Sequence, residues 1–151
     1  MEQNWERTFP FINIDHTKVE VLFDGILDKK DIKNITSISE GCRTSNYIAE
    51  GKEKKYLLKI FFSDKQVNKK EFLLLNKLKK EIYVQSIYKI STDEIIEGRQ
   101  FGIYEYIDGI SLGRYLAEGN KINYKFVKAV ARSLAKIHSY KFERAGFLMK
   151  I

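Results

Sequence analysis

KYLLKIFF, residues 55–62, decides the fold, because it has the pattern of a β-strand with one charge set among apolar side chains. Alternate residues of a strand face opposite sides. One side would carry Tyr56, Leu58, Ile60 and Phe62, and the other Leu57, Lys59 and Phe61. An ammonium buried without a partner costs several kcal/mol or loses its proton. We therefore expect a carboxylate, a phosphate site or both within reach of Lys59.

The next segment, residues 64–83, has the periodicity of an amphipathic helix and contains a candidate partner, Glu71. Within about a quarter turn of Glu71 the helix carries the apolar residues Val67, Leu74, Leu75, Leu78 and Ile82. Glu71 either borders this apolar stripe and reaches water through its long side chain, or it is buried against Lys59. The charge on the preceding strand favours burial, because each charge then gains the partner that it otherwise lacks.

The composition predicts one globular domain, since 44% of the 151 residues are hydrophobic and 13% are aromatic. No segment approaches the run of about 18 apolar residues that spans a membrane, and the first residues lack a signal-peptide pattern. We therefore expect a cytoplasmic protein without membrane association. One cysteine, Cys42, and two histidines exclude an internal disulfide and a zinc-type ligand cluster among these residues.

The net charge of +7 keeps a basic nucleic-acid-binding protein open as an alternative. The lysines, however, are spread along the chain and interleaved with acidic residues, as on solvated faces and turns. No helix-turn-helix, zinc finger or aromatic ribonucleoprotein motif is present. Nucleic acid is therefore not the partner that the sequence favours.

The order of predicted elements is three strands, a helix, two strands and two further helices. Residues 1–16 predict an irregular lead-in, and Asp15 or Thr17 can cap a helix that runs to about Asp28. Strands are expected from residue 32, at 47–50 and at 55–62, with a polar turn at 40–46 between the first two, and again at 84–91 and 99–107. Helices are expected at 112–117, capped by Ser111, and at 124–140.

Five segments in this order resemble the aminoglycoside phosphotransferase and choline kinase group of small-molecule kinases. They are residues 39–47, 57–60, 70–72, 102–112 and 134–139. The resemblance implies an α+β fold: a protein-kinase-like amino-terminal lobe, with a five-stranded antiparallel sheet and one αC-type helix, then the first helices of a truncated carboxy-terminal lobe. It divides the chain into an extension and helix (1–31), a nucleotide-binding lobe (32–107), and a hinge with the first helices of the next lobe (108–151).

The resemblance also implies an ATP site on the sheet. Lys59 would contact the phosphates and be held by Glu71. Gly41, Thr44, Ser45 and Asn46 would lie over the triphosphate, Ile48 and Leu57 would form an apolar roof over the adenine, and the main-chain carbonyl of Glu105 and amide of Ile107 would meet its edge. The alternatives are an ordinary hairpin turn for residues 41–46 and plain core packing for the roof.

The family's catalytic loop, a His-Gly-Asp type segment followed by an asparagine, and its metal-binding aspartate do not occur in residues 1–151. The expected function is thus the nucleotide-binding portion of a kinase that transfers the ATP γ-phosphate to a small-molecule hydroxyl. Magnesium would belong to the complete parent enzyme, and this chain, truncated or degenerate, is expected to be inactive. A non-catalytic interaction module on the same half-fold is the alternative.

The helix expected at 124–140 has an apolar face that later segments of the complete fold would cover. Its residues are Val127, Val130, Leu134 and Ile137. An open patch of aliphatic side chains is rare on a soluble monomer. We therefore expect a two-fold homodimer through this helix.

Overall fold

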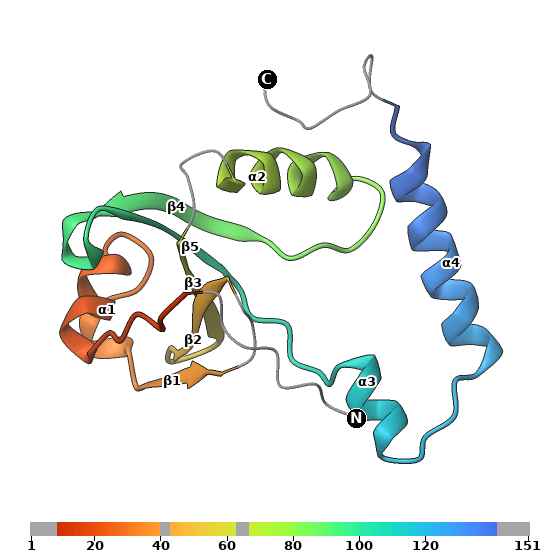
Figure 1. Ribbon diagram of the computed structural model, residues 1–151, viewed down its shortest axis with the longest axis horizontal. Coiled ribbons are helices and arrows are strands. Elements are labelled where there is room, and N and C mark those ends of the chain that lie inside the picture. The colour runs from red at the N-terminus through yellow and green to blue at the C-terminus, as the bar shows by residue number, and fades with distance from the viewer. Residues whose placement is uncertain (1–8, 40–42, 63–66, 142–151) are drawn as a thin grey trace. The chain divides into compact units, whose positions relative to one another are not determined.

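The computed structural model describes residues 9–39, 43–62 and 67–141 (Figure 1). In chain order its elements are α1 (His16–Leu22), η1 (Lys29–Asp31), β1 (Asn34–Ile38), β2 (Thr44–Glu50), β3 (Lys55–Phe61), α2 (Val67–Leu78), β4 (Ile87–Asp93), η2 (Glu94–Ile96), β5 (Arg99–Glu105), α3 (Leu112–Ala117) and α4 (Tyr124–Ser139). The predicted order of elements is confirmed.

The strands form one antiparallel sheet in the order β1-β2-β3-β5-β4, which confirms the predicted five-stranded architecture. In the hairpin of β2 and β3, Glu50 pairs with Lys55 and Ile48 with Leu57 across the short charged turn of residues 51–54. The register places Lys59 opposite Asn46 on one neighbouring strand and opposite Gly102 on the other.

One face of the sheet carries the hydrophobic core. Tyr56, Leu58 and Ile60 of β3 are almost completely buried there, as the alternation in residues 55–62 predicts. Helix α1 contributes its core side chains to the same cluster, namely Val19 and Leu22, and Phe23 follows directly after the helix. Each such side chain contributes about 1.5 to 3 kcal/mol when it leaves water, so this packing holds α1 against the sheet.

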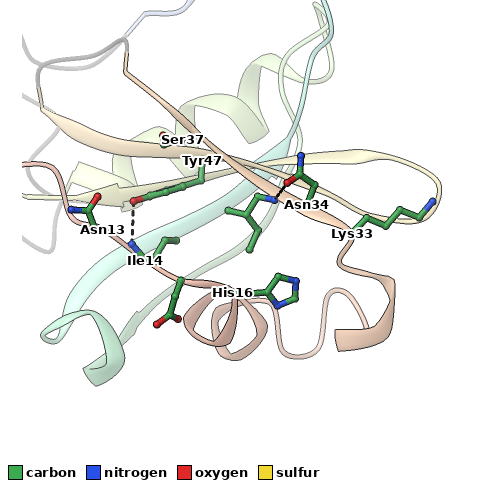
Figure 2. A pocket seen from close by; sticks show the side chains of 9 residues that line it. Asn13, Ile14, His16, Lys33, Asn34, Ser37 and Tyr47 are labelled. Atoms are coloured by element: carbon green, nitrogen blue, oxygen red, sulfur yellow. Dashed lines mark hydrogen bonds between the residues drawn. The ribbon is translucent and has the colours of Figure 1, made fainter.

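The irregular segment before α1 is fastened to the same face by two side chains of β2. The Ile12 amide donates to Ser45 Oγ at 2.8 Å, and the Tyr47 hydroxyl donates to the Ile12 carbonyl. The Ile14 amide in turn donates to the Tyr47 oxygen at 3.2 Å, a contact drawn in Figure 2. This segment forms no strand, so side chains of β2 supply the hydrogen bonds that its backbone groups need.

Several predicted boundaries differ from the structure; helix α2, for example, ends at Leu78 and not near Tyr83. Helix α1 ends at Leu22 and not near Asp28, because Gly25 takes a left-handed φ of +78° that redirects the chain. Strand β2 begins at Thr44, inside the predicted polar turn, because residues 44–46 pair with 59–61 of β3. Strand β4 begins at Ile87 and not at Val84.

The two residues just before β4 are hydrogen-bonded to Glu105, the last residue of β5. Gln85 Nε2 donates to the Glu105 carbonyl at 2.6 Å, and the Ser86 amide donates to a Glu105 carboxylate oxygen at 3.1 Å. The Glu105 amide also donates to the Ser86 carbonyl at 2.8 Å, so side-chain and backbone hydrogen bonds together hold residues 85 and 86 to the end of β5.

The chain divides into two compact units, Met1–Phe72 with Gln85–Tyr106, and Leu73–Val84 with Ile107–Ile151. In the second unit the predicted helices are confirmed as α3, capped by the Ser111 hydroxyl, and α4, capped by the Asn123 side chain. Lys136 of α4 donates to Glu81 at 2.7 Å. Among the helices that the structure describes, none has the length and apolar character needed to span a membrane.

Candidate functional site

The candidate site is built on an ion pair between β3 and the first half of α2. Lys59 Nζ lies 3.1 Å from Glu71 Oε1, and the two side chains are 22% and 30% exposed. The predicted partnership of Lys59 and Glu71 is therefore confirmed, although the pair is half-buried and not fully buried. Because both groups keep some exposure, the ammonium is paired and still accessible from solvent.

Tyr104 of β5 is a third member of this cluster, which the analysis of the sequence missed. Its hydroxyl donates to Glu71 Oε2 at 3.1 Å, and Lys59 Nζ lies 4.3 Å from the centroid of its ring. Burial raises the pKa of the Tyr104 phenol far above its ordinary value, and the adjacent Glu71 charge raises it further. Only the pairing of β3 with β5, which the chain order does not reveal, places Tyr104 beside Lys59.

Four predicted site residues share the sheet face of Lys59, because residues paired across an antiparallel ladder point to the same side. Asn46 is opposite Lys59, Thr44 is opposite Phe61, and Ile48 is opposite Leu57. The side chains of Thr44, Asn46, Ile48 and Leu57 are half-buried. The structure thus places two polar and two aliphatic side chains on the sheet face that carries Lys59.

Ser45 is placed differently from its predicted neighbours. It lies between Thr44 and Asn46 on β2, so its side chain points to the other face, where it is fully buried and accepts from the Ile12 amide. The expectation that the Ser45 side chain lies over a triphosphate rested on a turn at 40–46. Because this part of the turn is strand, only the backbone of Ser45 remains available at the site.

The remaining predicted contacts belong to the main chain. The Glu105 carbonyl accepts a hydrogen bond from Gln85 Nε2 at 2.6 Å. Ile107 falls in the second unit, where its side chain is 48% exposed. Gly41 lies outside the described residues.

The donor set suits an anion better than a metal ion. In the part of the chain that the structure describes, no group of three or more His, Cys, Asp or Glu side chains is placed to hold a metal. Glu71, the carboxylate of the cluster, is already shared by Lys59 and Tyr104. These residues therefore do not fit a magnesium site.

A separate polar cavity of about 380 Å³ lies on the opposite side of the sheet (Figure 2). It is lined by residues 13–16 before α1, residues of β1 with Lys33, and Tyr47 of β2. Lys59 pairs with Asn46, the residue before Tyr47, so the side chains of Tyr47 and Lys59 point to opposite faces of the sheet. This cavity is therefore not part of the Lys59 cluster.

Comparisons with known proteins agree on the kind of fold. A sequence model of the family described as "Phosphotransferase enzyme family" matches residues 34–149. Among solved structures, the streptomycin–ATP–APH(2")-IIa ternary complex is similar with a TM-score of 0.57 and 20% sequence identity. The similarity covers 88% of this chain and 42% of that one, so this chain spans less than half the length of its structural relative. A search of the curated proteins found no match.

Proposed function

The chain belongs to the phosphotransferase enzyme family, and from that premise we propose that it binds ATP on the sheet face that carries Lys59. ATP binding at this site would serve the transfer of the ATP γ-phosphate to a hydroxyl of a small molecule. The observation that carries the proposal is the half-buried Lys59 ammonium, which Glu71 holds at 3.1 Å on the sheet face that also carries Thr44 and Asn46.

The chemistry of phosphoryl transfer explains why such a lysine matters. The transferred phosphoryl group passes through a loose transition state that needs little covalent chemistry from the protein. A protein therefore contributes mainly by holding phosphate oxygens in place and neutralising their charge. A cation fixed by a carboxylate provides both, since Glu71 orients the ammonium without cancelling its donors. The structural relative is described as a complex with ATP and streptomycin, which supports a nucleotide and a small-molecule acceptor for this chain as well.

The adenine base of ATP would lie against the aliphatic side chains on the sheet face of Lys59. Ile48 and Leu57 face each other across the hairpin of β2 and β3 and supply an apolar roof. The Glu105 carbonyl and Ile107 amide would meet the polar edge of the adenine. Thr44 and Asn46, with the backbone of Gly41 and Ser45, would line the phosphates.

A polypeptide of residues 1–151 is expected to bind ATP weakly and to transfer no phosphate. Residues 1–151 contain neither the His-Gly-Asp type segment nor a metal-binding aspartate of the family, and magnesium would need ligands that these residues do not supply. One lobe supplies only part of the contacts that offset the cost of ordering a nucleotide. We place this reaction in the cytoplasm, because ATP is the phosphate donor there.

Calorimetric titration with ATP, together with an assay for ATP consumption in the presence of hydroxyl acceptors, tests this proposal. We expect a dissociation constant in the millimolar range and no turnover. Steady turnover that disappears in Lys59→Ala would place the transfer chemistry in these residues after all. Absence of any ATP binding would overturn the assignment of the site itself.

We also propose that the chain forms a two-fold homodimer through α4. Val127, Val130, Leu134 and Ile137 recur on one side of α4 and are 40% to 52% exposed. Pairing this face with its copy removes aliphatic surface from water at about 25 cal/mol per Å². The same association would serve a non-catalytic interaction module, the second candidate function, which this exposed face favours.

Sedimentation of the wild-type chain at micromolar concentration is expected to show a dimer, and Leu134→Glu is expected to give a monomer. Arg132→Gln is the control, since it changes the net charge equally but lies about 160° around the helix from Leu134. A wild-type monomer would refute the homodimer. Dissociation by Arg132→Gln alone would refute the assignment of the apolar face.

A further inference from the structure

Tyr104 is the most completely buried ionisable side chain near Lys59, and both its hydroxyl and its aromatic ring contact the cluster. Its residue has no exposed surface, its hydroxyl donates to Glu71 Oε2, and its ring lies beneath the Lys59 ammonium. A buried phenol needs a hydrogen-bond partner, and here the partner is the carboxylate that also holds the lysine. All three residues belong to the first compact unit.

Gly102 makes room for this arrangement. It pairs with Lys59 across the ladder and precedes Tyr104 by two residues, so the two share a sheet face. A Cβ at Gly102 would lie 2.5 Å from the nearest ring carbon of Tyr104 and 2.8 Å from its hydroxyl oxygen. The Tyr104 side chain therefore occupies the space beside Gly102 that the Cβ of any other residue would fill, and its hydroxyl reaches Glu71.

The two oxygens of Glu71 have separate donors. Oε1 accepts from the charged Lys59, and Oε2 accepts from the neutral Tyr104 hydroxyl. A phosphate near Lys59 would compete with Glu71 for the ammonium, but it would leave the hydrogen bond from Tyr104 intact. Because its pKa is raised, the phenol keeps its proton and stays a donor throughout the range in which proteins are usually studied.

We propose that Tyr104, seated over Gly102, is a positioning residue that holds the Glu71 carboxylate so that Lys59 stays directed at the phosphates of the nucleotide. This inference rests on the proposed ATP site. It assigns to the Tyr104 hydroxyl a function in phosphate binding, beyond a contribution to the packing of the sheet. The aromatic ring adds a second restraint, since an ammonium over a ring face is attracted to it.

The test compares ATP and adenosine binding to the wild-type chain, Tyr104→Phe and Tyr47→Phe. Tyr104→Phe lacks one hydrogen bond to a charged group. We therefore expect this variant to bind ATP roughly three- to tenfold more weakly than the wild type. Adenosine, which has no phosphate, is expected to bind Tyr104→Phe as it binds the wild type. Tyr47→Phe is the matched control, because it also removes a tertiary hydroxyl contact, but on the other face of the sheet.

The outcomes separate this inference from the proposed function. Unchanged ATP affinity in Tyr104→Phe, or an equal loss for ATP and adenosine, would overturn the positioning role and leave the ATP site standing. A wild-type chain that binds ATP no better than Lys59→Ala would overturn both. Gly102→Ala, which displaces the ring, is expected to weaken ATP binding at least as much as Tyr104→Phe, and a smaller loss would contradict the role of Gly102.

Discussion

Replacing Glu71 with alanine is expected to lower the free energy of unfolding by about 1 to 3 kcal/mol. The substitution leaves two groups without their partner: the Lys59 ammonium, with a side chain 22% exposed, and the fully buried Tyr104 hydroxyl. The partial exposure of the ion pair keeps the effect below the value for a completely buried pair. Urea denaturation followed by circular dichroism measures the change.

A second ion pair provides the control. Glu81 is paired with Lys136 at 2.7 Å, but the two side chains are 41% and 54% exposed. Solvent screens such a pair, so Glu81→Ala is expected to leave the unfolding midpoint unchanged. Equal stability of wild type and Glu71→Ala would show that the cluster of Lys59, Glu71 and Tyr104 does not contribute to the fold.

Replacing Lys59 with alanine is expected to weaken ATP binding about 10- to 100-fold, which corresponds to roughly 1.4 to 2.8 kcal/mol. The lysine is the charged donor of the cluster, and a charge-assisted hydrogen bond to phosphate is among the stronger polar contacts. Titration calorimetry with ATP compares the two proteins under identical salt.

Lys52→Ala is the matched control for this substitution. Lys52 lies exposed in the turn between β2 and β3, and its loss changes the net charge by the same amount. We expect ATP affinity to stay at the wild-type level. If Lys52→Ala weakens binding as much as Lys59→Ala, the general positive charge of the chain attracts ATP and the sheet holds no specific site.

Much of this fold was predictable from local patterns. The alternation around Lys59 identified β3, and Ser111 marked the start of α3. These features depend on residues close together in the chain, whose geometry follows from strand period and helix capping. The ion pair with Glu71 followed from the cost of leaving a charge alone.

The features that were missed depend on contacts between distant residues. Ser45 was assigned to the phosphate loop because a polar run suggests a turn, yet its hydroxyl instead fastens Ile12, 33 residues earlier. Tyr104 joins the site only because β5 pairs with β3 and not with β2. A glycine inside an apolar strand was the one local signal, since such a position often lets another group approach closely.

The central claim is that the Lys59 ammonium contacts the phosphates of ATP. The NMR signal of the Lys59 side chain tests this claim most directly. The measurement is an NMR titration of the Lys59 ε-methylene group with ATP and, separately, with adenosine, and Lys52 serves as the internal reference. We predict a saturable shift of Lys59 with ATP, none with adenosine, and no shift of Lys52 with either. A Lys59 signal that ATP leaves unmoved, or that moves only in step with Lys52, would contradict the account.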